Sequence, residues 1–326
     1  MAYTSIDDPT LYFNTLLYTG NGTSSHAVTG VGFTQDFTWI KERSQTESHF
    51  LFDKVRGDNK YFNSNNTDIQ YTESGGMAFN SNGFTLGAWN SVNENTENYV
   101  SWNWKESATS GFDIVSYTGN GSNPRTISHN LSAVPKFIIT KRLSGDTASI
   151  HCYHASLGNG YDIYLNGANA KASDTSWNST SPTSSVFTVN GANVNVSSTP
   201  YIAYLFSEKQ AFSKFSSYIG NGNTDGTYVH LGFKPAFVMI KNVDSTENWI
   251  MYDNKRDPIN VMDTILRANT NAADNTASAH NIDFLSNGFK HRNSDNQTNK
   301  SGENFIYMAF AESPFVTSTG IPTTAR

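Results

Sequence analysis

The stretch YTGNG begins at Tyr18, recurs at Tyr117, and returns as YIGNG at Tyr218. Successive copies are about 100 residues apart, which is the length of one small domain. A tyrosine and a glycine pair repeated at this spacing predict three copies of one structural unit.

Other blocks recur in the same order after each tyrosine motif. An apolar segment ending in lysine is present as FTWIK at 37–41, FIITK at 137–141 and FVMIK at 237–241. A closing block is present as YVSWNWKE at 99–106, YIAYLFSE at 201–208 and FIYMAFAE at 305–312. Matching blocks in one order, at nearly constant offsets, indicate a triplicated chain.

The recurring blocks have the character of β-strands. They are short, rich in β-branched and aromatic residues, and bounded by Gly, Asn, Asp or Ser. In the closing block apolar residues fall at every second position, so they share one face of a sheet. On that face we expect these large side chains to be buried: Trp102, Trp104, Tyr204, Phe206, Met308 and Phe310. Residues 260–269 (NVMDTILRAN) are the best helical candidate, for one short helix.

These patterns predict an all-β fold of three tandem jelly-roll or concanavalin-like β-sandwich repeats. The predicted units are residues 1–108, 109–211 and 212–326. Their connections are short and lack proline, so neighbouring units should pack against one another.

The GNG of each tyrosine motif is predicted to be a tight hairpin turn, because glycine accepts positive φ without steric cost and asparagine tolerates it. A phosphate-binding loop is the alternative. The sequence argues against this alternative, because all three segments lack the third glycine, a following helix and the P-loop lysine.

Composition limits the classes of partner. A formal charge of −6 with no run of Lys or Arg argues against nucleic acid and against an anionic membrane. The single cysteine, Cys152, leaves no internal disulfide. The first residues do not resemble a signal peptide, and no apolar run approaches the roughly 18 residues of a membrane span.

Catalytic and metal-binding patterns are weak. His151 and His154, three residues apart on a strand, should point to opposite faces, which argues against a metal site. Cys152 lies in an apolar segment, where a buried, inert thiol is the usual case. No GxSxG elbow is present. We therefore predict no catalytic residue, no metal and no cofactor.

One lysine and one glutamate recur in every copy. Paired carboxylates would suggest glycoside hydrolysis, but no second acidic residue recurs with the glutamate. We predict instead one structural ion pair in each unit: Lys41 with Glu106, Lys141 with Glu208, and Lys241 with Glu312.

Two tryptophans lie in polar stretches where loops are expected. Trp89 and Trp177 are surrounded by Asn, Ser and Thr, and an apolar ring beside such side chains is typical of a sugar-binding surface. These two residues are the candidate ligand-binding residues. The alternative is that each ring folds back as a lid on its own core.

The blocks YTGNG, LGFKPAFVMIK, LFDKVRG, SWNSTSPTSSVFTV and DFLSNGFK together resemble the repeat domain of structural proteins from marine tailed phages, including cyanophages and phages of pelagic bacteria. The resemblance extends over nearly the whole chain. It implies a concanavalin-like or jelly-roll sandwich in a tail fibre, a tail-associated knob or a capsid decoration. The second copy departs from the pattern, with CYHASLG where the others have Asp and Arg.

The expected function is therefore that of a non-enzymatic virion surface protein involved in host attachment through surface glycans. The expected partners are other tail or capsid proteins and further copies of the chain, with no nucleic acid and no membrane insertion. Assembly in the host cytoplasm and release by lysis would fit the absence of a signal peptide. The alternatives are an assembly adaptor that binds only other virion proteins and a glycan-degrading tailspike-type enzyme.

Overall fold

The computed structural model describes residues 3–323, which form an almost entirely β structure. The first unit follows η1 (Pro9–Leu11) and contains β1 (Phe13–Thr19), β2 (His26–Thr29), β3 (Phe37–Glu42), β4 (His49–Asp53), β5 (Lys60–Asn63), β6 (Tyr71–Thr72), β7 (Met77–Asn80), β8 (Gly83–Leu86), α1 (Asn90–Asn93) and β9 (Asn98–Trp104).

The second unit contains β10 (Phe112–Thr118), β11 (Arg125–Ser128), β12 (Phe137–Arg142), β13 (His151–His154), β14 (Tyr161–Tyr164), β15 (Ala172–Ser173), β16 (Val186–Val189), α2 (Gly191–Val194) and β17 (Pro200–Phe206). The third contains β18 (Ser213–Ile219), β19 (Tyr228–His230), β20 (Phe233–Asn242), β21 (Trp249–Asp253), β22 (Thr264–Arg267), β23 (Asn275–Thr276), η2 (Ser278–His280), β24 (Ile282–Leu285), β25 (Gly288–His291) and β26 (Asn304–Pro314).

One strand order occurs three times. The large six-stranded sheets run β1-β9-β3-β4-β5-β6, β10-β17-β12-β13-β14-β15 and β18-β26-β20-β21-β22-β23. Each large sheet packs against a smaller one, made of β2-β8-β7, β11-β16 or β19-β25-β24. The prediction of an all-β sandwich fold is confirmed. The predicted boundaries near 108 and 211 fall between β9 and β10 and between β17 and β18, while residues 1–2 and 324–326 lie outside the described part of the chain.

The predicted helix at residues 260–269 is wrong. Residues 264–267 form β22, which pairs antiparallel with β21 and places Leu266 opposite Met251. The first three residues of the strand are buried. Because sheet pairing buries this short apolar run, it overrides the weak helical pattern.

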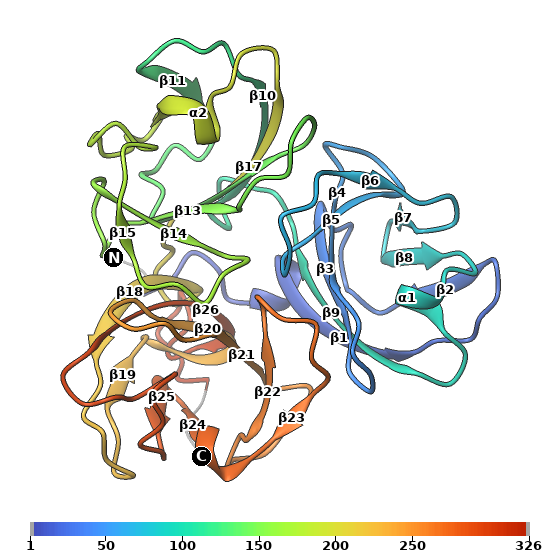
Figure 1. The fold of residues 1–326 in the computed structure, drawn as a ribbon. Helices are drawn as coiled ribbons and strands as arrows, with labels where there is room; N and C mark the ends of the chain where they lie inside the picture. The colour runs from blue at the N-terminus through green and yellow to red at the C-terminus, as the bar shows by residue number, and fades with distance from the viewer. Residues whose placement is uncertain (1–2, 324–326) are drawn as a thin grey trace.

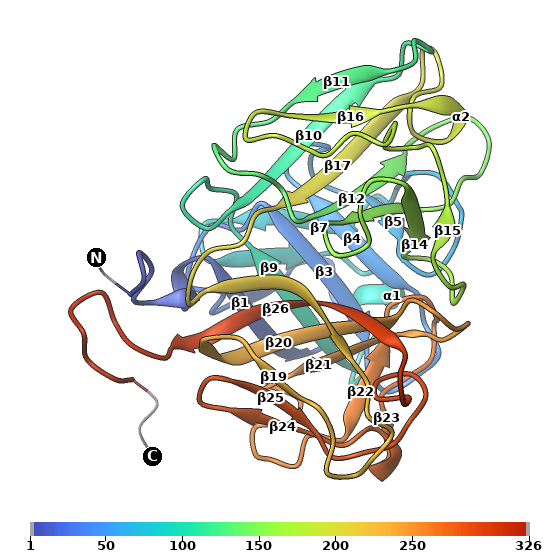
Figure 2. The ribbon, with the colours of Figure 1, turned by 90° about the vertical axis from the view of Figure 1, so that its left-hand side faces the viewer.

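The central strands of each large sheet are buried on both faces, whereas the edge strands β6, β15 and β23 are exposed. The outer face packs against the smaller sheet of its own unit, and the inner faces of all three large sheets meet in one shared core. At its centre the equivalent residues Trp104, Phe206 and Phe310 contact one another, with ring centroids 5.7–6.5 Å apart. Figure 1 shows the three lobes around this centre, and Figure 2 shows their strands from the side.

The six large side chains predicted to be buried are all between 0% and 4% exposed. Their burial is confirmed, but they lie between the units and do not fill the interior of a sandwich. A single unit would therefore expose this aromatic face to water.

The units contact each other in a closed ring. The backbone N–H groups of Gln70, Lys171 and Asp274 donate to carbonyls of the neighbouring unit, at Leu143, Val243 and Arg43 respectively. The same contact thus joins unit one to two, two to three, and three back to one. In each contact, one surface patch of a unit meets a different patch of the next unit. Three such head-to-tail contacts return to the first unit, so the units form a closed ring.

The second copy lacks the Asp and Arg that the other two copies have, and the reason is the residue that the neighbouring unit places opposite this position. In unit one, Asp53 pairs with Arg56 and accepts a 2.6 Å hydrogen bond from the Tyr204 hydroxyl of unit two. In unit three, Asp253 pairs with Arg256 and accepts the indole N–H of Trp102 from unit one at 3.2 Å.

Unit two faces Met308, which aligns with Trp102 and Tyr204 in the closing block but carries no side-chain donor. At this junction His154 and Leu157 replace the Asp and Arg. The His154 ring contacts the Tyr307 carbonyl at 3.3 Å, and burial lowers the pKa of His154 to about 4. A carboxylate here would lack the donor that its counterparts have.

The GNG motif is not a hairpin turn. It leads from β1 in a large sheet to β2 in a small one, and the equivalent segments do the same in the other units. The preceding tyrosine stacks on an aromatic ring of the closing strand, with centroids 4.9–5.0 Å apart in all three copies.

A fully buried asparagine fixes each GNG segment. Asn93, Asn195 and Asn299 each accept the backbone N–H of the GNG asparagine at 2.9–3.1 Å. The first glycine is required because a Cβ at Gly20 would lie 2.1 Å from the Glu94 carbonyl oxygen. The motif therefore recurs because it locks the crossover between the two sheets of every unit.

Candidate functional site

The recurrent lysines are buried, and none of them pairs with its predicted glutamate. The Lys141 ammonium donates to the carbonyls of Thr67 and Ala148 at 3.2 and 2.7 Å. The Lys241 ammonium donates to those of Ala168 and Glu247 at 3.0 and 2.6 Å. Thr67 and Ala168 belong to the neighbouring unit, so these two lysines stabilise the ring junctions.

The third lysine, Lys41, donates to the carbonyls of Glu42 and Gln45 within its own unit. The predicted pairs fail because of strand direction. Lys41 lies opposite Val100, whereas Glu106 lies beyond Trp104 at the other end of the same strand pair. The predictions of a Lys41–Glu106, a Lys141–Glu208 and a Lys241–Glu312 ion pair are therefore wrong.

Burial disfavours the charged form of these lysines. It lowers the pKa of Lys41 and Lys141 to about 8 and that of Lys241 to about 7. In the unfolded chain a lysine titrates near 10.4. Above about pH 7 the unfolded chain therefore holds protons that the folded chain has released.

We predict that the free energy of unfolding rises between about pH 7 and 8.5, by on the order of 1 kcal/mol per pH unit for each lysine that is neutral in the folded state. Urea denaturation across this range measures the slope. The Lys141→Met variant should show a smaller slope, because it lacks one of the three titrating groups. A free energy of unfolding that stays flat or falls over this range would contradict the assignment.

The three recurrent glutamates have different surroundings. Burial, then the neighbouring Asp113 carboxyl, raises the pKa of Glu106 to about 7. Glu208 lines a cavity of about 400 Å³ with Lys214 and His230. Glu312 pairs with Lys234 at 2.8 Å at the mouth of a larger cleft. Their recurrence therefore reflects the repeat and indicates no common chemistry.

The two candidate tryptophans do not form a shared surface. Trp177 is only 1% exposed and packs edge-on against Tyr153 inside unit two, so the prediction that it contacts a ligand is wrong. Trp89 is half-buried, with its ring 4.8 Å from that of Phe50 and 4.9 Å from that of Tyr61. Both rings cover their own core, as in the alternative given above.

The other residues singled out in the sequence are structural. Cys152 is buried, and burial raises the pKa of its thiol well above the usual range. The His151 ring contacts the buried Asp162 carboxylate, and His154 lies at the junction with unit three. Among residues 3–323, no cluster of three or more His, Cys, Asp or Glu side chains is placed to hold a metal ion.

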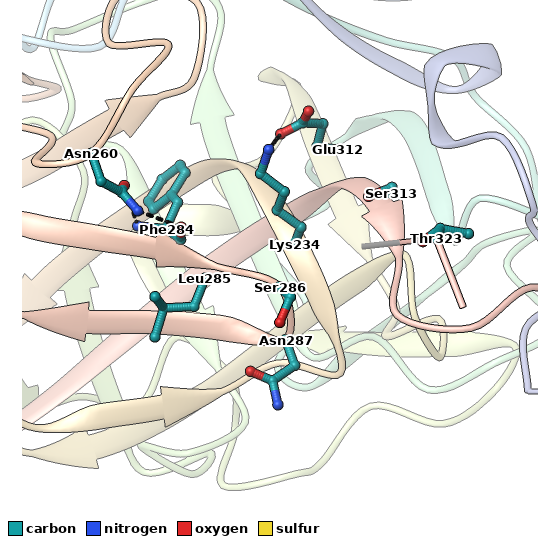
Figure 3. Close-up of a pocket in the computed structure, with 9 residues that line it drawn as sticks. All are labelled: Lys234, Asn260, Phe284, Leu285, Ser286, Asn287, Glu312, Ser313 and Thr323. Carbon is teal, nitrogen blue, oxygen red and sulfur yellow. Dashed lines mark hydrogen bonds and ion pairs between the residues drawn. The ribbon is translucent and has the colours of Figure 1, made fainter. Parts of the chain in front are cut away.

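Unit three carries a cleft of about 690 Å³. This volume lies within the range of small-molecule sites. Figure 3 shows the cleft with the Lys234–Glu312 pair on one side and the β24–β25 turn on the other. The lining residues are Lys234, Asn260, Phe284, Leu285, Ser286, Asn287, Glu312, Ser313 and Thr323. We call this the unit-three cleft.

A longer loop contributes Asn260 to the lining of the unit-three cleft. The connection between β21 and β22 spans residues 254–263, whereas the equivalent connections span only 54–59 and 155–160. Asn260 anchors the loop to β24 by donating to the Phe284 carbonyl at 2.8 Å and accepting the Phe284 N–H at 2.9 Å. Unit three thus has a longer connection than its two counterparts, and this connection supplies one of the residues that line the cleft.

An exposed aromatic ring extends the same surface. Tyr228 on β19 is 42% exposed, and its hydroxyl donates to the Asn287 side-chain oxygen at 2.7 Å. Asn287 lines the cleft, so an exposed ring, an amide and an ion pair lie along one surface. Sequence reasoning missed this site. The available signal was the extra length after Asp253 in the third copy, which the predicted helix at 260–269 overlaps only in part.

The fold and the cleft define a single-chain ring of β-sandwich units in which one unit has a ligand-sized site. The family described as Domain of unknown function (DUF7483) matches residues 8–314, so the chain belongs to that family. A comparison with curated proteins found no match. No helix within residues 3–323 is long and apolar enough to cross a membrane.

Proposed function

We propose that the chain is a non-enzymatic virion surface protein, a tail fibre, tail-associated knob or capsid decoration, that attaches the particle to its host by binding a surface glycan. The ligand site in this proposal is the unit-three cleft together with Tyr228. The resemblance of the sequence blocks to marine phage structural repeats supports the virion assignment.

One observation carries the binding role: unit three has a cleft of about 690 Å³, and the longer 254–263 loop contributes Asn260 to its lining. The lining combines amides and an ion pair, which are groups that bond sugar hydroxyls, and the exposed Tyr228 ring beside Asn287 offers a surface for a pyranose. Several copies on one particle would strengthen contacts that are weak individually.

The test is competition for host cells. Purified protein should bind the cells and reduce adsorption of the phage that carries it, and Tyr228→Ala should weaken this binding by about tenfold, the loss expected for about 1.4 kcal/mol. The matched control is Tyr71→Ala, because Tyr71 is also 42% exposed but lies on β6 of unit one. Equal effects of the two variants, or no binding by the wild type, would refute the proposal.

An assembly adaptor is the second candidate. Ile259 and Val261, on the 254–263 loop, are 79% and 46% exposed, and exposed aliphatic side chains favour protein contacts. If Ile259→Ser abolishes incorporation of the chain into particles while cell binding by the purified protein is absent, the adaptor role is correct.

A further inference from the structure

A second cavity of unit three lies beside the unit-three cleft. Its volume is about 400 Å³, and its lining includes Glu208 on the linker between units two and three, Lys214 on β18 and His230 on β19. Tyr3 also lines it, and its hydroxyl donates to the Gly232 carbonyl at 2.9 Å. This volume lies within the range of small-molecule sites. We call this second cavity the linker cavity.

Only the turn between β19 and β20 separates the two cavities. Leu231 and Gly232, in this turn, line the linker cavity, whereas Lys234, two residues further on, lines the unit-three cleft. The Asn287 carbonyl accepts the N–H groups of Leu231 and Gly232 at 2.9 and 3.0 Å, and Asn287 itself lines the cleft. The two cavities therefore lie on either side of one turn.

A row of exposed side chains connects the two cavities. Tyr228 and His230 alternate with the buried Val229 on β19, so their side chains share the outward face of the strand. The Tyr228 hydroxyl donates to Asn287 Oδ1 at 2.7 Å and lies 3.3 Å from His230 Nδ1. Because Asn287 lines the cleft and His230 lines the linker cavity, Tyr228 bridges the two.

The polar groups of the linker cavity are accessible to a ligand. The side chains of Glu208 and His230 are exposed, and that of Lys214 is half-buried. Within residues 3–323 the Glu208 carboxylate has no hydrogen-bond partner, and the Lys214 ammonium donates only to the His230 carbonyl, at 2.8 Å. The cavity therefore offers both donors and acceptors that a sugar hydroxyl can reach, since a hydroxyl donates and accepts.

The charges of the two cavities favour a neutral ligand. The unit-three cleft contains one ammonium and one carboxylate, from Lys234 and Glu312. The linker cavity contains one of each as well, from Lys214 and Glu208. With His230 neutral the formal sum is zero in both cavities, so neither selects a cation or an anion. A chain with the same charge on every sugar would meet a like charge in each cavity.

We propose that the unit-three cleft and the linker cavity are two subsites of one surface, which binds a linear, neutral oligosaccharide. The chain lies in both cavities and crosses the β19–β20 turn over the exposed Tyr228 ring. This inference rests on the proposed function, because it extends the same site and specifies the length and charge of the ligand.

Calorimetric titration with fragments of the host surface glycan, separated by length, tests the inference. We expect affinity to rise by at least about tenfold from the shortest fragments to those that span both cavities, and then to remain constant. Raising the salt concentration should change the affinity by less than about twofold, because the surface has no net charge.

Variants of the linker cavity separate the two subsites. Glu208→Ala and His230→Ala should each weaken binding of the long fragments by about fivefold, the loss of about one hydrogen bond, and leave binding of the short fragments unchanged. Unchanged binding of the short fragments shows that the cleft and Tyr228 are intact. The matched control is Glu73→Ala in unit one, which should bind fragments of every length like the wild type.

Equal affinity at every length, or wild-type binding of the long fragments by both linker-cavity variants, would overturn the inference. A strong salt dependence would overturn the assignment of a neutral ligand. The failures of the two proposals are distinguishable. If Tyr228→Ala weakens host-cell binding but length has no effect, only the second subsite is wrong. If no fragment binds and the Tyr228 variant adsorbs like the wild type, both proposals are wrong.

Discussion

Replacing Trp102 with alanine is expected to lower the free energy of unfolding by about 3–5 kcal/mol. Its side chain is fully buried in the shared core, with ring centroids 6.0 Å from Trp39 and 5.8 Å from Phe237. Its N–H also donates to the Asp253 carboxylate across the junction with unit three. The substitution therefore leaves a cavity and removes one of the hydrogen bonds that the Asp253 carboxylate accepts.

Equilibrium denaturation in urea or guanidinium measures the loss, and Trp89→Ala is the control. Trp89 is half-buried at the edge of its own unit, so its truncation should cost less. A Trp102→Ala variant as stable as the Trp89→Ala variant would show that the shared core is not a principal source of stability.

Residues 109–211 expressed alone are expected not to fold into a stable monomer. The inner face of this unit carries Ile114, Phe137, Ile139, Tyr204 and Phe206, all of which are buried against the other two units in the full chain. Exposed apolar patches of this kind lead to aggregation or association. Circular dichroism and sedimentation should show an unfolded chain or a self-associated species, with a homotrimer as the folded form that could restore the ring.

The intact chain serves as the comparison. It should unfold in a single cooperative transition by calorimetry, because all three units contribute to one core. Three separate transitions, or a well-folded monomer of residues 109–211, would contradict the ring.

The alternation of apolar residues identified the buried face of the closing strands but not the neighbours of that face. Trp104, Phe206 and Phe310 were expected to be buried, and they are. A period of two specifies which side chains share a face. Whether that face covers the unit's own second sheet or another unit depends on long-range packing, which no local pattern contains.

The ion-pair prediction failed for a related reason. The recurrence showed that one lysine and one glutamate, Lys141 and Glu208 in unit two, hold fixed positions in the repeat. It did not show that antiparallel pairing puts them at opposite ends of two paired strands. In the structure Lys141 lies opposite Ile202, and Glu208 lies beyond Phe206. The register between two strands that are paired in the sheet but distant in the sequence is set by the whole sheet.

The candidate site was also beyond simple sequence reasoning. Polar surroundings suggested that Trp177 lies at the surface, yet the ring fills the core of unit two. The unit-three cleft depends on a few additional residues in one copy and on their docking against β24. Aligning the three copies reveals the added length, but only the fold shows that Asn260 from this segment lines a cleft.

The most direct test of the account is hydrogen exchange of the intact protein with and without a bound oligosaccharide from the host surface. We predict slower exchange at residues 254–263 and 284–288, and no change at the equivalent connections 54–59 and 155–160, which act as internal controls within the same molecule. Equal protection in all three units, or protection at the Trp89 loop with none at 254–263, would contradict the assignment of ligand binding to the unit-three cleft.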